Sequence, residues 1–383
     1  MTPDRNNIDL LVYLCSCAVK GAAPDKDRLY QADLDELFFL ARRHKLAATA
    51  AVSVAKTGIV DDVFSKALIN AIRKRALFDT ERTAILNAFE EKGVWYMPLK
   101  GVVIQDLYPI YGMREMADND ILFDSSKVRV VREIMEARGF DVEQFGTGAH
   151  DVYYKKPVLN FEMHRMLFSK SNGEILNKYY DDVFALLVKD ENNGFGYHLN
   201  NEDFYVYFVS HAYKHFHNYG TGLRTLLDIY VFLKHFQDLD WDYIGTETKK
   251  LEISEFENTI RGLSLKLFDD EQLNEKEQEM YDLIAAAGVY GNVDTKVINA
   301  LGKEKRSVKD KLSYVVKRLG VPISENNPNY ETFKGTYPVF YEHKILLLFL
   351  PIYRLYRAAT IRRSRVLAEL YAVIKQGDSD PKK

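Results

Sequence analysis

The chain has 383 residues, of which 47% are hydrophobic and 28% charged, and its formal net charge at pH 7 is −3. This composition excludes an intrinsically disordered chain, and the charge excludes a general electrostatic attraction to nucleic acid. The only cysteines, Cys15 and Cys17, are typical of a reducing compartment rather than of a disulfide framework. The first residues also lack the pattern of a signal peptide, so we expect a cytoplasmic protein.

Residues 1–84 are predicted to form a helical N-terminal region. Apolar residues recur there at intervals of three and four, for example Leu34, Leu37, Phe38 and Ala41. This spacing places apolar side chains on one face of a helix.

Residues 85–170 are predicted to form a small mixed sheet with helices, which makes the fold class α+β. The run Val94 to Leu99 is β-branched and aromatic at its start, and Lys100-Gly101 follows it, which indicates a strand that turns into a helix. The other predicted elements are a strand at Asp118 to Phe123, a helix at Lys127 to Arg138, and strands at Phe140 to Glu143, Val152 to Lys155 and Val158 to His164.

Residues 171–383 are predicted to form a helical C-terminal region. Its most apolar segment, Ile345 to Tyr353, has about half of the ~20 residues that a membrane-spanning helix needs. We interpret it as a core helix rather than a membrane-surface segment, and expect no membrane partner. The predicted helices are Phe204 to Phe216, Leu223 to Phe236, Leu251 to Phe268, Lys276 to Ala287 and Val308 to Arg318.

Two aspartates, Asp118 and Asp120, lie two residues apart at the start of a predicted strand. Alternate residues of a strand point to the same face, so the two carboxylates project together. Like charges this close are unfavourable unless a cation lies between them, and paired carboxylates suit Mg²⁺ or Mn²⁺. The pair therefore predicts a metal site, and a polar strand end is the alternative interpretation.

A third carboxylate, Glu162, lies on the polar face of another predicted strand, together with Asn160 and His164. If this strand neighbours the one that begins at Asp118, three carboxylates converge, as a two-metal phosphoryl-transfer site requires. A solvent-exposed strand face is the alternative interpretation of Glu162.

A glycine and a cation, Lys100-Gly101, lie where the first predicted strand turns into a helix. Helix N-termini bind phosphate through unpaired backbone N–H groups, and glycine lets a ligand approach the backbone. The pair fits a nucleotide-binding turn, and an ordinary strand-to-helix turn is the alternative.

Three polar residues, His211, Lys214 and His215, lie close together on a predicted helix. The two histidines are four residues apart and therefore share a helical face. This spacing fits a zinc pair, or interfacial histidines that line a substrate cleft with Lys214 opposite the carboxylates. His164 is a further candidate for the lining of this cleft.

The chain resembles the bacterial nucleotidyltransferase-like proteins of the DNA polymerase beta superfamily. The resemblance is strongest from Val94 to Phe168 and covers about a third of the chain. The family motifs appear in order as Leu99-Lys100-Gly101, Tyr108-Pro109, Arg114 with Asp118 and Asp120, Gly139-Phe140, Glu162 with His164, His211-Ala212-Tyr213-Lys214-His215, and Leu223-Arg224-Thr225-Leu226-Leu227-Asp228.

The resemblance implies a metal-dependent enzyme that moves a nucleoside monophosphate from a nucleoside triphosphate to an acceptor. By this resemblance Asp118, Asp120 and Glu162 are the catalytic metal ligands, and Lys100, Gly101 and Arg114 belong to the nucleotide site. The acceptor, a small molecule, a protein or an RNA, stays open, as does the oligomeric state. Better-known members have Gly-Ser or Gly-Gly where this chain has Lys100-Gly101, so a degenerate nucleotide-binding or protein-interaction module is the alternative.

Overall fold

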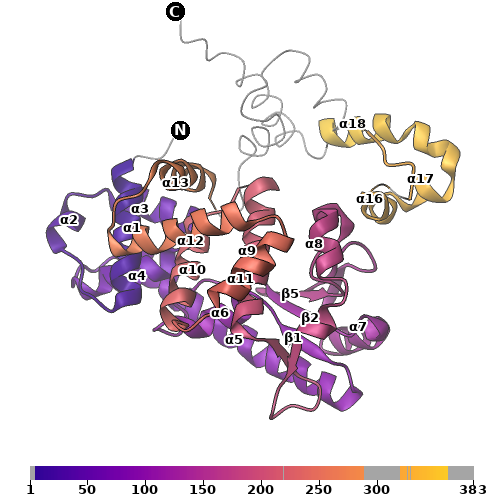
Figure 1. The fold of residues 1–383 in the computed structure, drawn as a ribbon, viewed down its shortest axis with the longest axis horizontal. Helices are drawn as coiled ribbons and strands as arrows, with labels where there is room; N and C mark the ends of the chain where they lie inside the picture. The colour runs from indigo at the N-terminus through magenta and orange to yellow at the C-terminus, as the bar shows by residue number, and fades with distance from the viewer. Residues whose placement is uncertain (1–4, 219, 289–319, 326, 328, 361–383) are drawn as a thin grey trace, which may run out of the picture.

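A computed structural model describes residues 5–218, 220–288, 320–325, 327 and 329–360 of the chain (Figure 1). The fold is α+β, as predicted, with a five-stranded mixed sheet and helices before and after it. Cys15 and Cys17 are free and buried.

The N-terminal region is helical, as predicted. Capping aspartates begin three of its helices, α2, α3 and α5. Before α5, for example, Asp61 accepts hydrogen bonds from the backbone N–H groups of Val63 and Phe64. Helix α5 ends at Gly93, whose left-handed φ of 62° closes the last turn. The helices are α1 (Arg5–Lys20), α2 (Lys26–Tyr30), α3 (Leu34–Arg43), α4 (Ala47–Lys56) and α5 (Asp62–Lys92).

The five strands lie in the order β1-β2-β5-β4-β3. The pair β2 and β5 is parallel, and the other neighbours are antiparallel, so the sheet is mixed as predicted. The strands are β1 (Tyr96–Pro98), β2 (Asn119–Phe123), β3 (Asp141–Gln144), β4 (His150–Lys155) and β5 (Leu159–His164), and the helices between them are α6 (Gly101–Ile104) and α7 (Val128–Ala137).

The two faces of the sheet differ in polarity. Ile121 on β2 and Phe161 and Met163 on β5 are fully buried against apolar side chains of α5 and α7. Because strand side chains alternate, Asp120 and Glu162 point to the other face. Burial of the apolar side chains on one face of the sheet therefore determines which way Asp120 and Glu162 point.

A second, two-stranded sheet follows the first and was not predicted. Strands β6 and β7 have three residues each, and most of their side chains are at least partly exposed, so no hydrophobic alternation marks them. A bridge between Tyr96 and Gly196 places this hairpin beside β1. The elements are α8 (Glu174–Tyr179), β6 (Leu187–Lys189) and β7 (Tyr197–Leu199).

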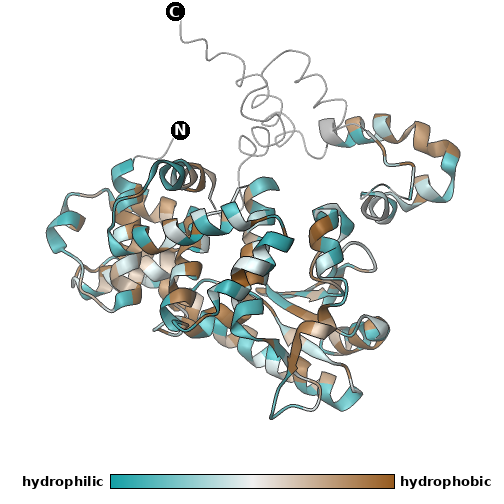
Figure 2. Ribbon diagram, in the orientation of Figure 1, coloured by the Kyte–Doolittle hydropathy of each residue, from teal (hydrophilic) through white to brown (hydrophobic). Residues whose placement is uncertain are grey.

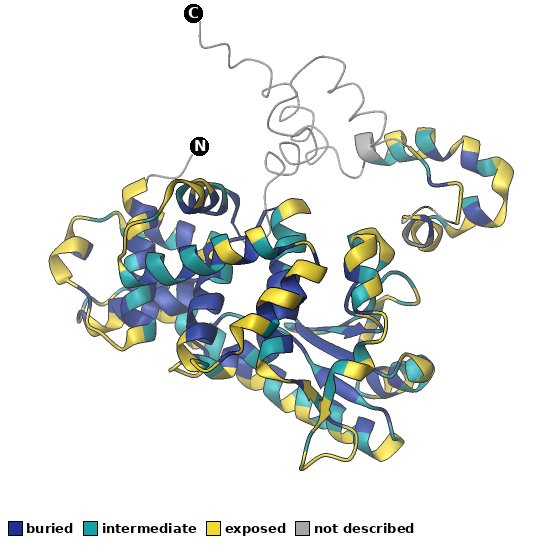
Figure 3. Ribbon diagram, viewed as in Figure 1, coloured by how far each residue is buried: buried dark blue, intermediate teal, exposed yellow. Residues whose placement is uncertain are grey.

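The next helices pack with the N-terminal ones in a single hydrophobic core. Figure 3 shows buried positions concentrated where α1, α4, α10 and α12 meet, and Figure 2 shows apolar residues there. Helix α11 was not predicted, and the predicted helix Val308 to Arg318 lies outside the described residues. The helices are α9 (Asn201–Asn218), α10 (Leu223–His235), α11 (Trp241–Lys250), α12 (Ser254–Asp269) and α13 (Glu275–Ala287).

The apolar segment Ile345 to Tyr353 is not the core helix that we expected. A short 3₁₀ helix ends at Leu348, and α18 (Leu350–Thr360) begins with Pro351 in its first turn, where proline is tolerated but prevents continuation from the preceding segment. Ile345 is 77% exposed and Leu348 74%. Within the described part of the chain, no helix has the length and apolarity to cross a membrane. The helices before α18 are α16 (Tyr330–Thr336) and α17 (Pro338–Glu342).

Candidate active site

A cleft of ≈540 Å³ lies between the polar face of the sheet and helices α9 and α10. It brings together residues from positions 100 to 228 of the chain. Every site residue predicted from the sequence lines it: Lys100, Gly101, Arg114, Asp118, Asp120, Glu162, His164, His211, Lys214 and His215.

The three carboxylates are brought together by the parallel pairing of β2 and β5. Asp120 is the register partner of Glu162 across the two strands, and Asp118 directly precedes β2. The sequence predicted that the carboxylates converge if these two strands are neighbours, and β2 and β5 are neighbours.

Asp120 is the most strongly engaged of the three carboxylates. Lys100 Nζ and His164 Nε2 each lie 2.8 Å from its Oδ1 atom. Burial alone would raise the pKa of Asp120, but the charge of Lys100 and the hydrogen bond from His164 hold that pKa below its ordinary value. Asp120 therefore stays ionised in a buried position.

Asp118 has the opposite electrostatic character. Burial first, and then the negative charges of Asp120 and Glu162, raise the pKa of Asp118 to about 6. This is the behaviour expected of a carboxylate crowded by like charges with too few cations nearby.

A further residue, His150 on β4, belongs to the site and was not predicted. Its register partner is His164, and its Nε2 lies 3.5 Å from Glu162 Oε2. His164 Nε2 lies 3.6 Å from the same oxygen. Extending the predicted hairpin by two residues upstream of Val152 would have placed His150 opposite His164.

The donor set fits a divalent cation. Potential ligand atoms of His150, Glu162 and His164 all lie within 4.8 Å of one another. Asp118 and Asp120 line the same cleft, but among the described residues neither belongs to this group. Oxygen ligands suit Mg²⁺ or Mn²⁺, whereas two imidazoles beside a carboxylate favour Mn²⁺ over Mg²⁺.

Lys100 lies at the strand-to-helix turn that the sequence indicated, in a backbone conformation that side-chain-bearing residues rarely adopt. Its φ is 44° and its ψ −112°, immediately before α6. Burial opposes its charge, but Asp120 keeps the pKa of Lys100 above its ordinary value. Strained backbone of this kind is often found at functional sites, where the surrounding structure maintains it.

Arg114 and Gly101 line the cleft, and their contacts connect it to helix α10. Arg114 donates from Nε and Nη2 to both carboxylate oxygens of Asp228, at 2.7 and 2.8 Å. A Cβ atom on Gly101 would lie 2.7 Å from Arg114 Nη1, so glycine is needed for the guanidinium to fit. A nucleotide-binding role for either residue stays a prediction. The helix ion pair that Arg224 forms with Asp228 is looser, at 4.0 Å.

The residues on α9 face the carboxylates across the cleft. His211 Nε2 and His215 Nε2 lie 3.1 Å apart. Burial lowers the pKa of His215 to about 3 and, with the nearby Lys100, that of Lys214 to about 8. Among the described residues, neither histidine belongs to a group of three potential metal ligands, so the geometry fits cleft-lining histidines better than a zinc pair.

The α+β core carries Asp120 and Glu162 on adjacent parallel strands. The chain belongs to a family described as uncharacterised nucleotidyltransferases, whose model matches residues 30–269. Searches of curated proteins and of solved structures found no match.

Proposed function

We propose that the protein transfers a nucleoside monophosphate from a nucleoside triphosphate to an acceptor, with a divalent metal held by Asp118, Asp120 and Glu162. The observation that carries the proposal is the register pairing of Asp120 with Glu162 beside Asp118, whose pKa is raised by burial and by these two carboxylates. His150 and His164 are further potential ligands.

The chain's own residues have distinct roles in this proposal. Lys100 and the backbone N–H of Gly101 bind the phosphates, and His164 orients Asp120 through the hydrogen bond to Oδ1. His211, Lys214 and His215 line the opposite wall, where the acceptor binds. The bound metal would supply charge neutralisation for the phosphates and activation of the attacking oxygen.

One observation favours a second candidate, a nucleotide-binding module without transfer activity. The ammonium of Lys100 already neutralises Asp120 in this structure, at 2.8 Å from Oδ1. In such a module the lysine would take the place of a metal permanently.

The test is metal-dependent release of pyrophosphate from each of the four common triphosphates, with Mg²⁺ or Mn²⁺ and a panel of acceptors. Asp118→Asn should reduce turnover by at least about 100-fold, because a catalytic metal supplies several kcal/mol of transition-state stabilisation. Asp141→Asn, on the exposed edge strand β3, is the matched control and should retain wild-type turnover. Triphosphate binding without pyrophosphate release under any condition would support the module instead, and unchanged turnover in Asp118→Asn would exclude the proposed metal site.

A further inference from the structure

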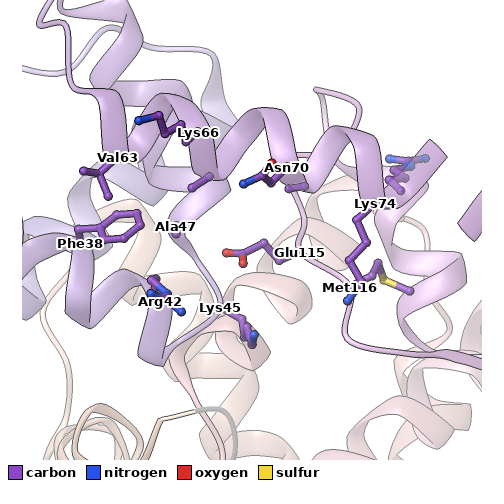
Figure 4. Close-up of a pocket in the computed structure, with 13 residues that line it drawn as sticks. Phe38, Arg42, Lys45, Ala47, Val63, Lys66, Asn70, Lys74, Glu115 and Met116 are labelled. Carbon is purple, nitrogen blue, oxygen red and sulfur yellow. The ribbon is translucent and has the colours of Figure 1, made fainter. Parts of the chain in front are cut away.

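A second cavity, of ≈500 Å³, lies between helices α3 and α5 and the segment that precedes β2 (Figure 4). Arg42 and Lys45 line one side, and Lys66 and Lys74 of α5 line another. Glu115 extends its carboxylate into the space between them, as Figure 4 shows.

The lining of this cavity has an excess of positive charge. Arg75 also lines it, but its guanidinium contacts Asp106 and donates to the backbone oxygen of Gln105. The other lining cations, Arg42, Lys45, Lys66 and Lys74, have Glu115 as the only carboxylate among the described lining residues.

For Lys66 and Lys74, the contacts already made inside the cavity do not balance this charge. The Glu115 carboxylate also accepts a hydrogen bond from the backbone N–H of Ala48, at 3.3 Å, at the start of α4. The ion pair of Lys66 with Asp62 is 3.9 Å long and exposed at both ends, so it contributes little. Burial, and then the charge of Lys45, lower the pKa of Lys74. An anion in the cavity would relieve this crowding of cations.

We propose that this cavity binds a small molecule through a phosphate group, at a site separate from the carboxylate cleft. A phosphate can accept several charge-assisted hydrogen bonds at once, which matches Arg42, Lys66 and Lys74 better than a single carboxylate does. The volume is typical of small-molecule pockets, and Phe38, Val63 and Met116 supply apolar walls for the rest of the ligand.

The segment 115–118 connects the two cavities. Met116 lines both of them. Lys74 donates to the backbone oxygen of Ala117 at 3.3 Å, and Arg224 of the cleft donates to that of Glu115 at 3.0 Å. The proposed phosphate site and the carboxylate cleft therefore share the segment that leads to Asp118.

Calorimetric titration of the full chain with inorganic phosphate, in chelator-containing buffer, tests the binding. The double variant Arg42→Ala, Lys66→Ala replaces two exposed cations of the lining. It should weaken phosphate binding by at least about tenfold, because two charge-assisted hydrogen bonds are lost. Arg73→Ala is the matched control, because Arg73 is exposed on the same helix but does not line the cavity. It should bind phosphate like the wild type.

A second set of titrations distinguishes phosphate binding in this cavity from phosphate binding in the carboxylate cleft. Phosphate binding should persist in Lys100→Ala, and phenyl phosphate should bind more tightly than inorganic phosphate because of the apolar walls. Binding lost in Lys100→Ala but retained in the double variant would place the anion in the cleft and overturn the proposal. No saturable phosphate binding by the wild type at millimolar concentration, or binding of single-stranded RNA but not of phenyl phosphate, would also overturn it. None of these outcomes depends on transferase activity.

Discussion

Within the cleft, Lys100 Nζ and His164 Nε2 both contact Oδ1 of Asp120, whereas the dominant influences on Asp118 are burial and two neighbouring carboxylates. Two aspartates of one motif therefore contribute to stability with opposite signs. Asp120 stabilises a buried lysine, and Asp118 adds repulsion that a bound cation would remove.

The first prediction separates the two aspartates in the absence of metal. Asp120→Asn should lower the free energy of unfolding by several kcal/mol, on the order of 3, because it leaves the Lys100 charge buried without its partner. Asp118→Asn should raise that free energy by about 1 kcal/mol, because it removes a charge that burial and the repulsion of two carboxylates make unfavourable. Urea denaturation in chelator-containing buffer measures both. Equal losses of stability in the two variants would contradict the conclusion that the Asp120 charge is stabilising and the Asp118 charge is destabilising.

The second prediction concerns the backbone of Lys100. Glycine normally destabilises a position by roughly 0.5 to 1 kcal/mol relative to alanine, through backbone entropy. At φ 44° and ψ −112° the order should reverse, so that Lys100→Gly is more stable than Lys100→Ala by about 1 kcal/mol or more. Both variants lose the ion pair with Asp120, so their difference in urea denaturation reports the backbone alone. A more stable alanine variant would show that the turn relaxes without strain.

Helices α6 and α10 are joined through Arg114, which lies in the segment before β2 and pairs with Asp228 on α10. Tyr108 also donates to Asp228, at 2.8 Å. All three side chains are buried. This group fixes the segment that leads to Asp118 against the C-terminal helices. Because Arg114 also contacts Gly101, a change in packing at Gly101 affects both helix α6 and the carboxylate cleft.

The third prediction compares two helical glycines. Gly→Ala in a helix normally stabilises by roughly 0.5 to 1 kcal/mol, and Gly245→Ala in α11 should do so because a Cβ there meets nothing within 4 Å. Gly101→Ala should instead destabilise by about 1 to 3 kcal/mol, because its Cβ would lie 2.7 Å from Arg114 Nη1 and overpack a buried site. Thermal and urea unfolding of the pair provide the measurement. Stabilisation by both substitutions would mean that Arg114 moves away freely.

Elements with a clear hydrophobic pattern could be predicted from the sequence, and those held by distant partners could not. Strand β5 alternates apolar and polar residues, and β2 ends in the apolar run Ile121 to Phe123. The predicted bounds of both strands agree with the structure to one residue. By contrast, β6 and β7 have no such pattern. The pairing of Arg114 with Asp228 joins residues 114 positions apart, and the sequence contains no local signal for it. For the same reason the site was predicted without His150, whose place depends on strand register.

At the scale of the whole molecule, the helices before and after the sheet form one core, although about 100 residues separate them in sequence. Leu11 and Leu37 from the N-terminal helices share it with Leu226 and Ile260 from the C-terminal ones. We therefore expect these two helical regions to unfold together. His44, at the end of α3, lies at their junction, where its Nδ1 accepts a hydrogen bond from the backbone N–H of Leu223 at 3.1 Å.

The fourth prediction uses this junction to test the shared core by pH. Burial first, and then the charge of Arg43, lower the pKa of His44 from 6.5 to about 4. Between these two values the unfolded chain binds a proton that the folded chain does not, so stability falls as the pH decreases from 6.5 towards 4. His44 should account for roughly 3 kcal/mol of this loss, at 1.36 kcal/mol for each pKa unit.

His44→Asn removes the titration while its amide oxygen can still accept the hydrogen bond from Leu223, the first residue of α10, whose N-cap makes no side-chain hydrogen bond. The wild type should exceed this variant in unfolding free energy most above pH 6.5, and the difference should shrink as the pH falls to 4. His235→Asn, an exposed position on the same helix, should follow the wild type at every pH. Because His44 connects the two helical regions, fluorescence and circular dichroism should give the same shifted midpoint. Two separate transitions, of which only one responds to His44→Asn, would show instead that the regions unfold independently.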